Sequence, residues 1–198
     1  MKTKNIMTDT KKMMIVGGGG QGTLLASKLL GKMLLENGYD VKVSEVHGMS
    51  QRGGSVVTYV CWGDKVYSPI VDRGEADFIL SFELLEAARY LEYLKKDGII
   101  ITNTQKINPM PVIMGNAEYP TDIVEKISAK GRNIEALDAL SLAREAGTEK
   151  AVNLVLLGKA AKYFDFSRQM WLDTIETSVP EKFVEINKRA FLLGYGEA

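Results

Sequence analysis

The first 46 residues show a hydrophobic and polar pattern that predicts a strand, a helix and a second strand. The apolar run 13–16 ends at a glycine-rich stretch, GGGGQG (17–22). Over 23–38, charged residues recur every four positions while leucines occupy the opposite side, which is typical of an amphipathic helix. Asn37-Gly38 ends this helix, and 39–46 alternates like a strand. We therefore expect a β-α-β unit whose first turn is rich in glycine.

The middle of the chain continues the alternation of strands and helices. Two strand-like runs within 55–70 flank Gly63-Asp64 and predict a β-hairpin, so the sheet is expected to be mixed. Buried strands are predicted at 76–81 and 99–103, on either side of an amphipathic helix over 82–96.

The second half becomes progressively helical. An irregular segment, 105–120, surrounds a short strand predicted for PVIM (111–114), and a further strand is predicted at 133–139. From Lys150 onwards the apolar spacing is that of helices. The whole pattern predicts a three-layer α/β/α Rossmann-like domain with a mixed, mostly parallel sheet, a β-hairpin insertion and a helical C-terminal third.

Length and charge narrow the class of protein. The 198 residues suit one domain, which we place at 13–198 after a disordered N-terminal tail at 1–12. Twenty-five basic residues balance twenty-five acidic ones, which argues against nucleic acid or an anionic membrane as a partner. No apolar run approaches the ~20 residues that span a bilayer. The polar start lacks the apolar core of a signal peptide, so we expect a cytoplasmic protein.

The chain has one cysteine, Cys61, and one histidine, His47. A structural zinc site takes four cysteine or histidine ligands, and an iron–sulfur cluster takes four thiolates. The chain alone can therefore build neither site, and we predict no metal site in it. If the protein takes part in electron transfer, the metal belongs to another chain.

The stretch GGGGQG fits the pattern G-x-G-x-x-G between a strand and a helix. Glycines there allow a tight turn and let a phosphate approach bare N–H groups at a helix N-terminus. Glu45, near the end of the second predicted strand, stands where a ribose-binding acid is expected. The alternative is a turn that only lets helix and strand pack closely. The candidate residues of this glycine turn are Gly17, Gly19, Gly20, Gln21 and Gly22.

The loop EVHGMSQRGGS (45–55) is the second candidate site. It follows the second strand, at the edge where open α/β sheets bind ligands. Histidine can move a proton near neutral pH, and arginine can clamp a carboxylate or phosphate. The alternative is a solvated surface loop. The candidate residues here are His47, Ser50, Gln51, Arg52, Gly53 and Gly54.

Several segments together resemble one protein family. These are GGGGQGTLLASKLLG, SEVHGMSQRGGSVVTYV, VYSPIV, GEADFILSFELLEA, IIITNT and AVNLVLLGKAA. They are similar to the small (beta) subunit of indolepyruvate:ferredoxin oxidoreductase, the gamma domain of the 2-oxoacid:ferredoxin oxidoreductases. Two positions depart from that pattern: Cys61-Trp62 replaces an expected basic residue, and Leu84 replaces a usual proline.

The resemblance implies the oxidative decarboxylation of an aryl pyruvate to an aryl-acetyl-CoA. It places thiamine diphosphate and the [4Fe-4S] clusters in a large partner subunit. Coenzyme A is then a co-substrate, and ferredoxin accepts electrons through the complex. The small subunit is expected to be inactive alone and to help wall the active site.

The resemblance also gives the candidate residues their roles. His47 and Arg52 are expected to act in catalysis, while the glycine turn, Ser50, Gln51, Gly53 and Gly54 approach a cofactor. Two alternatives remain open. The chain could be a free-standing dinucleotide-binding oxidoreductase, or a purely structural partner subunit. In the latter case exposed aromatic residues would mark the interface, namely Trp62, Trp171 and Tyr195.

Overall fold

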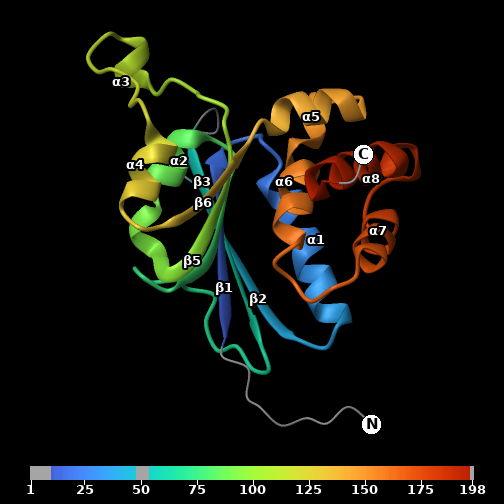
Figure 1. The fold of residues 1–198 in the computed structure, drawn as a ribbon. Coiled ribbons are helices and arrows are strands. Elements are labelled where there is room, and N and C mark those ends of the chain that lie inside the picture. Colours follow the sequence, from blue (N-terminus) through green and yellow to red (C-terminus); the bar gives the residue numbers. More distant parts are fainter. Residues whose placement is uncertain (1–9, 48–53, 197–198) are drawn as a thin grey trace.

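The computed structural model describes residues 10–47 and 54–196, without the side chain of His47. Within these residues, six strands form one sheet in the order β2-β3-β1-β4-β5-β6. Helices cover both faces of the sheet (Figure 1). The predicted α/β/α architecture is therefore confirmed. The strands are β1 (Lys11–Gly18), β2 (Asp40–His47), β3 (Ser55–Gly63), β4 (Ala76–Ser81), β5 (Leu94–Asn103) and β6 (Asn133–Leu137).

The sheet is mixed, as predicted, but the hairpin is formed by different strands. β1, β4, β5 and β6 pair in parallel, whereas β3 runs antiparallel to both β1 and β2. The antiparallel hairpin therefore consists of β2 and β3. The predicted second arm, 65–70, is not a strand. Its Val66 N–H donates to Asp40 Oδ2 at 2.9 Å and Val66 is buried, so this run covers the sheet instead of pairing with it.

The helices divide into two layers, seen on either side of the sheet in Figure 1. One layer contains α1, α6, α7 and α8, with α5 beside them, and the other contains α2 and α4. The helices are α1 (Thr23–Glu36), α2 (Leu84–Arg89), α3 (Met110–Ile113), α4 (Ile123–Ala129), α5 (Ala139–Ala146), α6 (Val152–Ala161), α7 (Arg168–Glu176) and α8 (Val184–Tyr195). Three short 3₁₀ turns are η1 (Leu91–Tyr93), η2 (Glu149–Ala151) and η3 (Glu181–Phe183).

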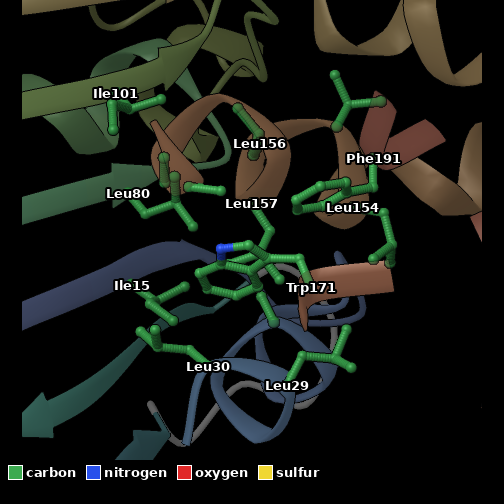
Figure 2. Packing of buried hydrophobic residues seen from close by; sticks show 14 of the residues in the cluster. Ile15, Leu29, Leu30, Leu80, Ile101, Leu154, Leu156, Leu157, Trp171 and Phe191 are labelled. Atoms are coloured by element: carbon green, nitrogen blue, oxygen red, sulfur yellow. The ribbon is translucent and has the colours of Figure 1, made fainter. Parts of the chain in front are cut away.

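Each layer has its own hydrophobic core because side chains alternate along the strands. In β1, Ile15 faces the larger core and Met14 faces the smaller one. Trp171 of α7 lies at the centre of the larger core, between Leu30 of α1 and Leu157 of α6 (Figure 2). Both faces of the sheet are therefore packed against helices.

Two further predicted elements are wrong. The helix predicted over 82–96 ends at Arg89, and β5 already begins at Leu94, which is buried in the smaller core. Packing of Leu94 against the sheet thus overrides the helical spacing. The PVIM segment is not a strand, because Met110–Ile113 forms the short helix α3 after Pro109. β1 also begins at Lys11, two residues before the boundary predicted at Met13.

Candidate functional site

The glycine turn joins β1 to α1 at the carboxyl end of the parallel strands. Gly20 and Gly22 have φ values of +89° and +88°, in the left-handed region that favours glycine. Gly22 is the N-cap of α1. The glycine pattern thus has a conformational cause that needs no ligand.

Gln21 folds back into its own turn. Its Oε1 accepts a hydrogen bond from Gly18 N–H at 2.6 Å. A Cβ added to Gly17 would lie 2.8 Å from this oxygen and 2.9 Å from Phe82 Cβ. The turn is therefore bonded internally. Gly17 has no room for a side chain, and the N–H of Gly18 is already donated to Gln21.

The two candidate segments lie side by side. Gly19 N–H donates to Gly54 O at 3.1 Å, and Gly18 pairs with Ser55 in the register of β1 and β3. The backbone of His47 pairs with Val56 at the same end of the sheet. The glycine turn therefore anchors the end of the loop. The remaining loop candidates, Ser50, Gln51, Arg52 and Gly53, lie outside the described residues.

Asn153 supports the turn from the opposite side, a role that the sequence did not reveal. It is 3 % exposed, and its Nδ2 donates to Gly22 O at 3.3 Å. Asn153 lies near the start of α6, 131 positions further along the chain. The N-cap of α6 is Ala151, so Asn153 does not cap this helix.

Glu45 lies on β2, which is separated from β1 by β3. Its carboxylate accepts a hydrogen bond from Thr58 of β3 at 2.9 Å. In the dinucleotide fold the acid stands on the strand next to the glycine turn. The inserted β3 removes that neighbourhood, so the spacing of Glu45 is not accompanied by the expected geometry.

A cavity of about 190 Å³ opens beside the glycine turn. It lies between the turn, α2 and the segment that carries α3. Its lining residues are Gly17, Gly18, Ser55, Glu83, Leu85, Glu86, Arg89, Ile107, Asn108, Pro109, Met110 and Ile113.

Two buried carboxylates dominate the charge of this cavity. Glu86 accepts hydrogen bonds from Ser55 Oγ at 2.7 Å and from Arg89 at 2.6 Å. Glu83 is the N-cap of α2, and its Oε2 accepts from Glu86 N–H at 3.0 Å. Arg89 is paired with Glu86, so the described lining holds two carboxylates and one guanidinium and is acidic overall.

Glu83 also holds the segment that follows β5. Its Oε1 accepts from Ile107 N–H at 3.0 Å and from the Tyr119 hydroxyl. Burial and the hydrogen bond to Glu83 raise the pKa of Tyr119 well above its usual value. The tyrosine therefore stays a neutral donor at physiological pH.

A larger cavity of about 780 Å³ lies at the opposite, amino end of the parallel strands. Two of its lysines share one carboxylate: Asp77 accepts from Lys95 at 2.9 Å and from Lys11 at 3.1 Å. Open α/β sheets bind ligands at the carboxyl ends of their strands. We therefore infer that this cluster stabilises the amino ends of the strands and does not bind a ligand.

Several further residues lie away from the glycine turn or in the core. Ser68-Pro69 is at the opposite end of the sheet from the turn, where Pro69 O accepts from Cys61 Sγ at 3.4 Å. Trp62 and Trp171 are 5 % and 0 % exposed, so neither marks a surface. Asn103 is buried, and its Oδ1 accepts from Ala139 N–H at 3.1 Å.

The described part of the chain contains no cluster of His, Cys, Asp or Glu able to hold a metal ion. Burial raises the pKa of Cys61 to about 11, which keeps it a neutral thiol. No helix among the described residues is long and apolar enough to cross a membrane.

Comparison with known proteins agrees with this fold. The pyruvate ferredoxin/flavodoxin oxidoreductase family matches residues 12–197, and the chain belongs to this family. Indolepyruvate oxidoreductase subunit IorB of Thermococcus kodakarensis is 48 % identical over 92 % of this chain and 93 % of its own length. The subunit of the same name from Pyrococcus horikoshii is 47 % identical over the same shares.

Solved structures show the same fold at lower identity. The pyruvate oxidoreductase subunit PORC of Thermotoga maritima superposes with a TM-score of 0.70 at 22 % identity, covering 95 % of this chain and 96 % of that one. A 2-oxoglutarate:ferredoxin oxidoreductase from Magnetococcus marinus, solved with coenzyme A bound, gives a TM-score of 0.73 at 16 % identity. This chain covers 97 % of its own length and 31 % of that protein.

Proposed function

We propose that this chain is the small subunit of a ferredoxin-dependent 2-oxoacid oxidoreductase that acts on indolepyruvate or a related aryl pyruvate. The complex would release carbon dioxide, join the acyl group to coenzyme A and pass two electrons to oxidised ferredoxin. The observation that carries the proposal is the 48 % identity, over nearly the full length of both chains, to a subunit of indolepyruvate oxidoreductase. Its place of action is proposed to be the cytoplasm.

The chemistry of this chain supports a division of labour between two subunits. With one cysteine and one histidine, the chain cannot supply the four thiolates of a [4Fe-4S] cluster. The described lining of the cavity beside the glycine turn carries two carboxylates and one guanidinium, which disfavours a diphosphate there. We therefore assign thiamine diphosphate and the clusters to a large partner subunit, with coenzyme A as co-substrate.

The loop between β2 and β3 is proposed to complete the active site from the side of this chain. Arg52 would meet a carboxylate or phosphate, and His47 would take part in a proton transfer. Ser50, Gln51, Gly53 and Gly54 would approach the cofactor or co-substrate. The glycine turn, from Gly17 to Gly22, supports this role because it holds the loop's end through Gly54.

The loop's role can be tested by replacing Arg52 with alanine in the assembled complex. If its guanidinium meets an anionic group, we expect the rate of ferredoxin reduction with indolepyruvate and coenzyme A to fall at least about tenfold, the effect of losing one charged hydrogen bond of 1.5–3 kcal/mol. Steady-state kinetics would show whether KM or kcat carries the loss. Lys28→Ala, on the exposed side of α1, is the matched control. A complex that assembles and turns over at the wild-type rate with Arg52→Ala would refute the role.

A free-standing dinucleotide-binding enzyme is less well supported. The N–H groups of Gly18 and Gly19 are donated within the protein, and β3 separates Glu45 from the glycine turn. Titration calorimetry with NAD(H), NADP(H) and flavins decides between the two proposals, since micromolar binding to the isolated chain would favour the dinucleotide enzyme.

The alternative of a purely structural subunit is weakened as well. Two of the aromatic residues expected to mark its interface, Trp62 and Trp171, are buried.

A further inference from the structure

The segment 104–122, between β5 and α4, extends away from the sheet and carries α3 near its far end (Figure 1). We call it the apolar arm. Its side chains Met110, Ile113 and Met114 are 63 %, 64 % and 64 % exposed. Between 107 and 117 the sequence INPMPVIMGNA contains no charged residue. A group of exposed apolar side chains without charges marks a protein interaction surface.

The base of the apolar arm is fixed to the domain. One oxygen of Glu83 accepts hydrogen bonds from both ends of the arm, from Ile107 N–H at 3.0 Å and from the Tyr119 hydroxyl. Leu84 N–H also donates to Gln105 O at 3.0 Å. Because the arm is held at its base before any partner arrives, less conformational entropy is lost when it binds.

The arm is continuous with the acidic cavity. Ile107, Met110 and Ile113 line the same 190 Å³ cavity as the glycine turn. Among the described residues, Glu83 is bonded only by neutral donors, the N–H groups of Ile107 and Glu86 and the Tyr119 hydroxyl, although it is 3 % exposed. A buried carboxylate without a cation is costly, and a positive charge at the cavity mouth would lower that cost.

We infer that the apolar arm docks into an uncharged, apolar groove of the large partner subunit, and that a basic side chain of that subunit faces the mouth of the acidic cavity. This inference rests on the proposed function. The arm, the cavity and the glycine turn then form the face through which the small subunit joins the complex.

The experiment compares two double variants of the full chain. Met110→Asp with Ile113→Asp places charges on the tip of the arm. Leu35→Asp with Ile70→Asp is the matched control, because those side chains are 59 % and 59 % exposed but lie on α1 and after β3. Affinity for the purified large subunit is measured by titration, and thermal unfolding verifies that each variant is folded. We expect the arm variant to bind at least about tenfold more weakly, equivalent to 1.4 kcal/mol, and the control to bind like the wild type.

The outcomes separate this inference from the proposed function. If the wild-type chain itself neither binds nor activates the large subunit, the proposed function fails. If the wild type binds and the arm variant binds equally well, only the docking role of the arm is overturned. A wild-type chain that is dimeric alone, and monomeric after the arm substitutions, would instead assign the arm to self-association. If wild-type binding does not weaken as the salt concentration is raised, the proposed basic side chain at the cavity mouth is refuted.

Discussion

Three buried or half-buried amides hold the site by bonding to the backbone, and two of them connect distant parts of the chain. Gln21 closes the glycine turn on Gly18, Asn103 joins β5 to the start of α5, and Asn153 joins α6 to Gly22. Sequence reasoning identified the glycines of the turn but not Asn153, because its partner is 131 positions away and no local pattern links them. The turn is thus shaped by conformation and by these bonds.

We predict that Gly22→Ala destabilises the protein more than Gly20→Ala. Both positions have positive φ, which costs an alanine roughly 1–2 kcal/mol. Only at Gly22 would the new Cβ also meet a side-chain atom, Asn153 Nδ2 at 2.8 Å, whereas nothing lies within 4 Å at Gly20. Denaturant unfolding of the two variants measures the difference. Equal losses of unfolding free energy would show that Asn153 does not restrict the turn.

Several secondary-structure elements match the predictions made from the sequence. The helix after the glycine turn and the strands near 76–81 and 99–103 were expected and are present. The errors lie where a tertiary contact overrides local spacing, as at Leu94, which starts β5 inside a predicted helix. No pattern in the sequence predicted the close crossing of α6 and α8. A Cβ on Gly158 would lie 2.1 Å from Phe191 O, and one on Gly194 would lie 1.9 Å from Val155 O.

Replacing Gly158 with alanine should therefore force α6 and α8 apart. We expect a loss of about 1–3 kcal/mol in unfolding free energy, the usual cost of overpacking a core. Gly31→Ala in α1 is the control, because its new Cβ would meet only Val43 Cγ2, at 3.8 Å. That control should be neutral or gain roughly 0.5–1 kcal/mol from its better helix propensity. Thermal or denaturant unfolding distinguishes the two, and a Gly158→Ala variant as stable as the wild type would contradict the close crossing.

For the whole molecule, the decisive feature is the strand order, with β3 inserted between β2 and β1. This order separates Glu45 from the glycine turn and brings the ends of the β2–β3 loop to it. At the edge of the sheet opposite β2, β6 is held to α6 by Glu135, which pairs with Lys159 at 2.7 Å and accepts a hydrogen bond from Tyr163. The sheet edge and the helical layer are thus joined by ionisable groups.

This link predicts a loss of stability in acid. The hydrogen bonds from Lys159 and Tyr163 lower the pKa of Glu135 below its ordinary value of 4.5. A carboxyl whose folded pKa is lowered contributes stability above its unfolded pKa, and that contribution disappears as pH falls through the folded pKa. Unfolding of the wild type and of Glu135→Gln should therefore differ most near neutrality and converge below pH 4.5. A difference that is independent of pH would contradict the role of this charge.

The sequence by itself determined the class of fold, the position of the glycine turn and the chain's inability to hold an iron–sulfur cluster. These follow from apolar period, from the conformational freedom of glycine and from a count of possible ligands. Only the tertiary structure decided which strands are neighbours, what Asn153 and Glu83 hold, and that the apolar arm stands exposed beside an acidic cavity. Those facts depend on contacts between residues far apart in the chain, which no local pattern encodes.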